Sequence, residues 1–181
     1  LAKNKEVIEK LTNNKVTEDR LLQATRLLNN RRRALQRLYN ARKAHPVPIS
    51  GKDALLVTQV SFYDDAVRCT QQVNALCDEL EKRITTGEGV FPPDAPRILV
   101  SGSPMAIPNW KVHHMLESAG AAVVCEESCI GTRAFSDLVP EDRGTVEEQI
   151  GVMAERYMNI HCACFTPNDE RLDDIIRLAR E

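Results

Sequence analysis

The sequence lacks a long apolar run, a secretory leader and a marked excess of either charge. Its longest apolar stretches, near Ile98–Val100 and Ala121–Cys125, have the length of buried strands, whereas a membrane-spanning helix needs about 20 apolar residues. The chain starts with Leu-Ala-Lys-Asn-Lys and stays charged, unlike a leader. Hydrophobic residues make up 43% of the 181 residues and charged residues 28%, as in a folded domain. We therefore expect a soluble, cytoplasmic protein without a membrane partner.

Familiar hydrolase and nucleotide-binding motifs are also missing. The sequence contains no Gly-x-Ser-x-Gly nucleophile elbow and no Gly-Lys-Ser/Thr phosphate loop. Ser101-Gly102-Ser103 follows a predicted strand and resembles a phosphate-binding turn, but it lacks the full Gly-x-Gly-x-x-Gly spacing. We keep Ser101, Gly102 and Ser103 as candidate cofactor-binding residues, and Ser103 also as a candidate catalytic residue.

The formal net charge of −2 hides an uneven distribution of charged residues. Residues 1–50 hold 12 of the 24 basic residues but only 4 of the 26 acidic ones. Arg31-Arg32-Arg33 is the densest basic cluster, and it lies in a segment with helical leucine spacing in which Tyr39 is the nearby aromatic residue. The pattern favours a solvated helix face that packs on the acidic half of the chain or on a missing neighbour. It gives no support to nucleic-acid binding, so we expect no nucleic-acid partner.

Capping residues and leucine spacing predict three helices in the first half, at residues 17–43, 51–60 and 65–87. Thr17 supplies a capping hydroxyl for the first of them, and His45-Pro46 stops it. Asp64-Asp65 caps the third helix, which is expected to end at Gly87. The first half is therefore predicted to be entirely helical.

The proline-rich segment 91–96 divides a helical segment, residues 1–93, from an α/β domain, residues 94–181. After it, the sequence predicts a strand, a helix, a strand and two helices at residues 97–102, 109–120, 121–125, 145–159 and 168–179. Thr145 and Glu148 have the spacing of a capping box, and Asn168 is the expected cap of the last helix. Such a β-loop-α-β unit is right-handed and typical of a Rossmann-like parallel sheet. Two strands make an incomplete sheet, so we expect a fragment that lacks sheet partners.

Six cysteines are unusual for a protein that we place in a reducing compartment. Cys69 and Cys77 follow a helical apolar pattern and are predicted to pack as small hydrophobic residues. The other four, Cys125, Cys129, Cys162 and Cys164, are candidate metal ligands because the topology brings their segments to one rim of the sheet. Their C-x3-C and C-x-C spacings differ from the usual C-x2-C of structural zinc. Buried thiols without metal explain them equally well.

Two acidic residues follow the second predicted strand, so at least one is expected to face the same rim. Glu126 and Glu127 are therefore candidate catalytic residues; holding Arg133 or capping a turn are the structural alternatives. His113 and His114 are adjacent on a predicted helix and point in different directions, so a metal shared between them is not expected.

At these positions the sequence resembles a known family. The segments are Ser101–Met105 with Pro108–Lys111, Val124–Arg133 with Cys-Glu-Glu-Ser-Cys-Ile-Gly-Thr-Arg, and Cys162–Arg171 with Cys-Ala-Cys-Phe-Thr-Pro-Asn. Together they are similar to the 2-hydroxyacyl-CoA dehydratase D-component family, which includes benzoyl-CoA reductase subunits and double-cubane cluster proteins. The Cys-Ala-Cys-Phe-Thr-Pro-Asn run is most similar to the double-cubane branch.

The resemblance implies Rossmann-like domains that hold an iron–sulfur cluster, [4Fe-4S] or double-cubane, through cysteines. It also implies an ATP-hydrolysing activator that delivers low-potential electrons, a homo- or heterodimer, and an acyl-CoA or other small-molecule substrate. Cys129, Cys162 and Cys164 match the family's motif cysteines best, and Cys125 is a further ligand candidate. The sequence departs from the family at Ser103, where a cysteine is half expected, and at Ala134, where an aromatic residue often follows the arginine.

Two alternatives stay open beside an electron-activated reductase or dehydratase. The first is a structural zinc site with four thiolates in a binding module. The second is an interaction domain whose thiols are merely buried. Because the expected ligand set is incomplete, a fragment of this length is predicted to be inactive by itself, and the resemblance to the family is compatible both with a bound cluster and with none in this fragment.

Overall fold

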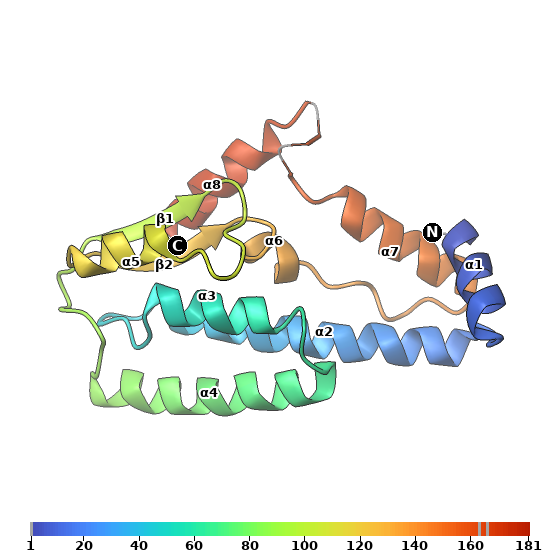
Figure 1. The fold of residues 1–181 in the computed structure, drawn as a ribbon, viewed down its shortest axis with the longest axis horizontal. Helices are drawn as coiled ribbons and strands as arrows, with labels where there is room; N and C mark the ends of the chain where they lie inside the picture. The colour runs from blue at the N-terminus through green and yellow to red at the C-terminus, as the bar shows by residue number, and fades with distance from the viewer. Residues whose placement is uncertain (1, 163, 166) are drawn as a thin grey trace.

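The computed structural model describes residues 2–162, 164–165 and 167–181 and shows a mixed α/β fold. Helices from the first half lie beneath a small sheet, and helices from the second half lie beside and above it (Figure 1). None of the described helices combines the length and the apolarity that crossing a bilayer requires. In chain order the elements are α1 (Ala2–Thr12), α2 (Glu18–Ala41), α3 (Gly51–Val60), α4 (Ala66–Thr86), β1 (Arg97–Ser101), α5 (Lys111–Ser118), β2 (Ala122–Glu127), α6 (Thr132–Phe135), α7 (Val146–Met158) and α8 (Glu170–Arg180).

The main hydrophobic core lies between the two longest helices, α2 and α4, which run side by side (Figure 1). Apolar side chains spaced three or four residues apart form one stripe on each helix, as an amphipathic helix requires. Cys69 and Cys77 belong to this core, as their spacing predicted, with exposed fractions of 3% and 0%. The buried members are Ala34, Leu35, Leu38, Ala41, Ile49, Ala54, Cys69, Val73, Cys77, Leu80 and Phe135.

Helix ends in the first half follow the capping signals in the sequence. The Thr17 hydroxyl accepts a hydrogen bond from the Arg20 amide, and the Asp65 carboxylate accepts two at the start of α4. Gly87 ends α4 in the left-handed conformation with φ of 72°, which glycine adopts without a steric cost. The structure adds α1, which the sequence analysis had not delimited.

The two strands pair in parallel, as predicted, from Arg97 opposite Ala122 to Ser101 opposite Glu127. The register shifts by one residue between Ile98 and Leu99. β2 continues to Glu127, two residues beyond its predicted end. Glu126 and Glu127 therefore belong to the strand itself, and the expectation that they follow it was wrong. The stretch after them, predicted to be mostly loop, contains the short helix α6.

Contacts connect the helical half to the sheet across the predicted boundary near residue 93. The start of α3 lies directly on β2, since a Cβ added at Gly51 would be 2.4 Å from the Val123 carbonyl oxygen. The Glu117 carboxylate of α5 accepts a hydrogen bond from the Gly51 amide at 2.6 Å, a favourable place for a negative charge at a helix N-terminus. The division into residues 1–93 and 94–181 stays a prediction, and these contacts join the two parts.

Candidate functional site

The guanidinium of Arg133 connects two segments that are distant in sequence and carry cysteines. Its Nη1 lies 3.8 Å from the sulfur of Cys129 and 3.8 Å from the sulfur of Cys162. Cys162 is in turn 3.1 Å, sulfur to sulfur, from Cys164. The loop after β2 and the loop before α8 therefore bring three of the four predicted metal-ligating cysteines to one place.

These three thiols are accessible and lie in a polar setting. Cys129 and Cys164 are exposed and Cys162 is half-buried. The backbone amide and the thiol of Cys164 lower the pKa of Cys162 most, Arg133 and Cys129 lower it further, and burial opposes them. The neighbouring Cys162 raises the pKa of Cys164. Cys162 is thus the member of the pair that more readily carries the thiolate, the form that binds metal.

Cys125 has different surroundings. It is 3% exposed, and its sulfur accepts a hydrogen bond from the Tyr39 hydroxyl of α2 at 3.7 Å. Burial raises the pKa of Cys125 to about 11 despite the opposing hydrogen bond from Tyr39. The contacts that link the other three cysteines are not present for Cys125 within the described residues, and its role as a ligand stays a prediction.

Glu127 holds Arg133 in position from the end of β2. It pairs with the Arg133 guanidinium, and its second oxygen accepts a hydrogen bond from the Ser101 hydroxyl at 2.6 Å. Arg171 of α8 approaches the same oxygen at 3.4 Å and the Ser101 hydroxyl at 3.3 Å. Glu127 is 2% exposed, so its charge is compensated inside the protein. Of the alternatives for this acid, holding Arg133 is the role that the structure shows.

The loop between Glu127 and Arg133 folds back tightly onto the strand. A Cβ added at Gly131 would lie 1.9 Å from the carbonyl oxygen of Glu126, a position that no side chain could share. The Gly131 amide donates a hydrogen bond to the Ser128 carbonyl at 3.0 Å. This close return places Cys129 and Arg133 at the end of the strand, on either side of the turn.

Glu126 belongs to a separate buried network. Arg42, the residue that follows α2, contacts its two oxygens at 2.6 and 2.8 Å, and Nε2 of His113 lies 2.9 Å from one of them. Burial by itself would raise the pKa of Glu126, but the charge of Arg42 and the His113 contact lower it to about 2. All three side chains are at most 5% exposed. Glu126 therefore joins β2 to α5 and to the residue that follows α2. The candidate catalytic role of Glu126 stays a prediction.

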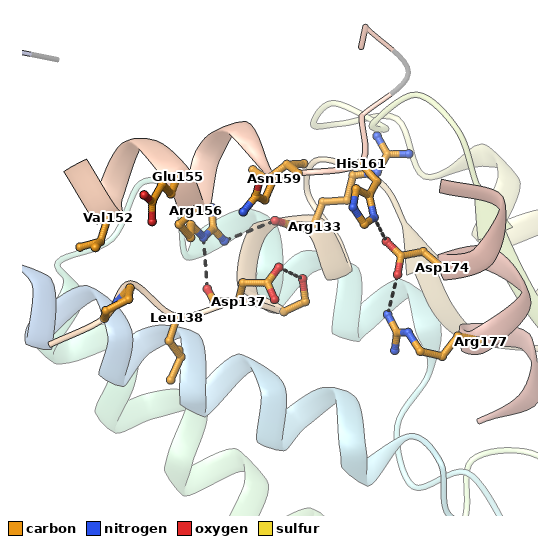
Figure 2. Close-up of a pocket in the computed structure, with 13 residues that line it drawn as sticks. Arg133, Asp137, Leu138, Val152, Glu155, Arg156, Asn159, His161, Asp174 and Arg177 are labelled. Atoms are coloured by element: carbon orange, nitrogen blue, oxygen red, sulfur yellow. Dashed lines mark hydrogen bonds and ion pairs between the residues drawn. The ribbon is translucent and has the colours of Figure 1, made fainter. Parts of the chain in front are cut away.

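A cavity of about 500 Å³ lies beside Arg133, between α7, α8 and the segment after α6 (Figure 2). His161 points toward Asp174 of α8, with Nδ1 2.7 Å from the carboxylate, and Arg177 binds the other oxygen of Asp174 at 3.1 Å. Arg156 crosses the cavity wall and donates to the carbonyls of Asp137 and Ala134. The cavity thus offers a histidine oriented by a carboxylate, one residue before Cys162.

The predicted phosphate-binding turn contacts the end of β2, and its role in cofactor binding stays a prediction. The Ser101 hydroxyl binds Glu127, and the Gly102 amide donates to the Glu127 carbonyl at 3.2 Å. Ser103 is exposed.

Asn168 was wrongly predicted to cap α8. The helix begins at Glu170, one residue later than that cap requires, and the Asn168 amide donates to the Cys162 carbonyl at 2.6 Å. Asn168 therefore shapes the cysteine loop.

Sequence reasoning missed several residues of this arrangement. Arg42, His113 and Arg171 had no local signal, because their partners are 13 to 84 residues away in the chain. Cys129 and Cys162 share Arg133 as a neighbour, and Cys164 lies beside Cys162. In the part of the chain that the structure describes, no three His, Cys, Asp or Glu residues are grouped as metal ligands.

Comparison with known proteins gives consistent matches over the whole length. A family model described as "2-hydroxyglutaryl-CoA dehydratase, D-component" matches residues 1–181. The chain is 31% identical over 175 residues to the dehydratase subunit YjiM of Escherichia coli (strain K12), covering 96% of this chain and 44% of that protein. It is 24% identical over 179 residues to the (R)-phenyllactyl-CoA dehydratase beta subunit of Clostridium sporogenes, covering 98% and 45%. The chain spans less than half the length of these two relatives.

Proposed function

Because the chain belongs to the 2-hydroxyglutaryl-CoA dehydratase D-component family, we propose that it forms an iron–sulfur-binding part of a dehydratase or reductase of that kind. The observation that supports the proposal is that Cys129 and Cys162 both contact Arg133, while Cys164 lies beside Cys162. The resemblance extends the proposal to a cytoplasmic enzyme that works with a second subunit and with an ATP-hydrolysing activator. The substrate class proposed on the same ground is an acyl-CoA thioester.

The side chains present suit an iron–sulfur cluster. Thiolates are the ligands of such clusters, and hydrogen bonds and charges near the sulfurs tune the reduction potential. Cys129, Cys162 and Cys164 would hold the cluster, with Cys125 kept as a prediction for a fourth position. Arg133 would place a positive charge and N–H donors against two of the thiolates, and Glu127 would fix the guanidinium in that position. When bound, the cluster supplies single-electron transfer.

The cavity beside Arg133 is the proposed place for the reacting part of the substrate. With a volume of about 500 Å³, it has the size of a pocket for a small molecule and admits an acyl group rather than a whole CoA thioester. His161, held by Asp174, is the group in it best placed to hold or pass a proton. Glu126 and Glu127, which are buried and paired with arginines, are assigned positioning roles in this proposal.

The test is the iron and acid-labile sulfide content per chain after anaerobic purification, with the visible spectrum of the same sample. We expect several irons with matching sulfide and a broad visible absorption. Cys129→Ser and Cys162→Ser should each lower the iron content severalfold, whereas Cys69→Ser, a buried cysteine of the α2–α4 core, should leave the iron content unchanged. Protein without iron and sulfide would overturn cluster binding, and zinc at one per chain would replace it with a structural zinc site.

A further inference from the structure

A second, smaller cavity borders Cys129 on the side of α2. Its volume is about 210 Å³, and four arginines line it: Arg31, Arg32, Arg133 and Arg156. Tyr157 and Phe62 contribute aromatic walls. Within the described residues its lining contains no carboxylate. A small space therefore concentrates positive charge next to a thiol that the proposed function assigns to a cluster.

Arg32 is buried and has no acidic partner among the residues that the structure describes. Its side chain donates to the Asn29 amide oxygen at 2.9 Å and to the Tyr157 hydroxyl at 3.3 Å, and both acceptors are neutral. The residue is 8% exposed. Burial, followed by the positive charges of Arg156 and Arg31, lowers the pKa of Arg32. A buried cation is unfavourable unless an anion compensates it.

Arg156, which also lines the cavity, is likewise a buried arginine. It is 6% exposed and donates to the backbone carbonyls of Asp137, Ala134 and Arg133 at 3.1, 2.9 and 3.4 Å. Its guanidinium carbon lies 4.8 Å from the centre of the Tyr157 ring. Neither Arg32 nor Arg156 forms an ion pair in the described part of the chain, in contrast to the buried Arg42 and Arg133. Two uncompensated guanidinium groups thus share one cavity.

We propose that this cavity binds an oxyanion, the carboxylate or phosphate group of a small molecule, between Arg32 and Arg156. Planar guanidinium groups bind carboxylate and phosphate oxygens through paired N–H donors. A volume of about 210 Å³ corresponds to roughly seven water molecules at about 30 Å³ each. It holds one oxyanion with a short attached chain and excludes a nucleic-acid strand. Arg31, whose Nη1 donates to the Ser61 carbonyl at 2.7 Å, adds charge at the edge.

The site does not depend on a bound cluster, because Arg32 and Arg156 donate to Asn29, to Tyr157 and to backbone carbonyls rather than to the cysteines. Arg133 and Arg156 also line the larger cavity beside His161. The two cavities share a wall at these side chains. Binding of an oxyanion and content of iron are consequently separate measurements, and either can fail while the other holds.

Calorimetric titration of the protein with inorganic phosphate and, separately, with acetate tests the site, in buffers matched for chloride and ionic strength. We expect saturable binding of at least one of them; phosphate alone points to a phosphate-bearing ligand and acetate to a carboxylate. Arg32→Gln should weaken the binding at least tenfold, and Arg32→Lys less, since lysine keeps the charge but loses the paired donors. Arg26→Gln, an exposed position on the same helix, should bind like the unaltered protein.

Two results would overturn the proposal. One is the absence of saturable heat with both anions in the unaltered protein, a result that needs no variant to fold. The other is equal affinity in Arg32→Lys, Arg32→Gln and Arg26→Gln, which would place any bound anion elsewhere on the surface.

Discussion

Glu126 and Glu127 are neighbours in β2, are both nearly fully buried, and each faces an arginine, yet they do different work. Glu126 closes a network with Arg42 and His113 that joins three elements. Glu127 holds an arginine whose other side contacts two cysteine sulfurs and borders two cavities. The same pair of residue types can therefore serve the fold or the site, and what surrounds the arginine decides which.

Removal of Arg42 tests whether the Glu126 network stabilises the fold. Arg42→Met leaves Glu126 buried without its cation, which should lower the free energy of unfolding by about 3–5 kcal/mol. Urea denaturation measures this loss. Arg37→Met, which removes a half-buried arginine of α2 whose partners Asp78 and Glu81 are exposed, should cost much less. Equal losses in the two variants would show that the Glu126 network is not a special source of stability.

The contribution of the Glu126 network to the unfolding free energy should depend on pH. Because the pKa of Glu126 is lowered from 4.5 to about 2, its contribution is fully present above pH 4.5 and disappears as the pH falls through 2. The shift corresponds to about 3 kcal/mol of unfolding free energy. Unfolding followed between pH 5 and 2 should therefore be flatter in Glu126→Gln than in the unaltered protein. Parallel slopes would contradict the lowered pKa.

Glu127→Gln should affect the site more than the fold. The amide keeps one acceptor for Arg133, so we expect a loss of about 1–3 kcal/mol in unfolding free energy. The positive charge of Arg133 is then no longer neutralised beside Cys129 and Cys162. The visible spectrum or the iron content should change in Glu127→Gln and stay unchanged in Glu126→Gln. A change of the spectrum or iron content in both variants, or in neither, would contradict the prediction that only Glu127 acts on the cysteines.

The Ser101 hydroxyl, which donates to Glu127, should contribute less to stability than the arginine pairs do. Ser101→Ala removes the 2.6 Å hydrogen bond to that carboxylate, which should cost about 1 kcal/mol in unfolding free energy. Ser101 and Ser103 are both exposed, but the Ser103 hydroxyl forms no hydrogen bond in the part of the chain that the structure describes. Ser103→Ala should therefore be neutral in thermal unfolding. If both variants behave alike, Ser101 does not hold Glu127.

Local signals in the sequence predicted much of the fold. The caps at Thr17 and Asp65, the end of α4 at Gly87 and the capping box of Thr145 and Glu148 are all present, because each depends on residues within one helical turn. The parallel pairing of the strands followed from the β-loop-α-β order. Asn168 failed as a cap because Asp169 takes the N-cap position, while the Asn168 amide donates to the Cys162 carbonyl in the preceding loop.

The site was predictable only as far as topology allowed. Strand ends meet at one edge of a sheet, so the meeting of Cys129 with the loop of Cys162 and Cys164 could be expected. The network of Arg42, Glu126 and His113 could not, because an arginine gives no sign in the sequence of which distant acid it pairs with. The register shift in the sheet and the end of β2 at Glu127 depend equally on packing that no local pattern contains.

The guanidinium of Arg133 has a consequence for how variants combine. One side chain contacts Glu127, Cys129 and Cys162 at once, so each substitution there alters the partner of the others. Effects at contacting positions of this kind do not add, whereas effects at independent sites do. Double-mutant cycles among Glu127, Cys129 and Cys162 should therefore show coupling energies, and cycles that pair any of them with Arg42 should close near zero. The two networks are expected to vary independently through evolution and in the laboratory, although their acids are joined by a single peptide bond.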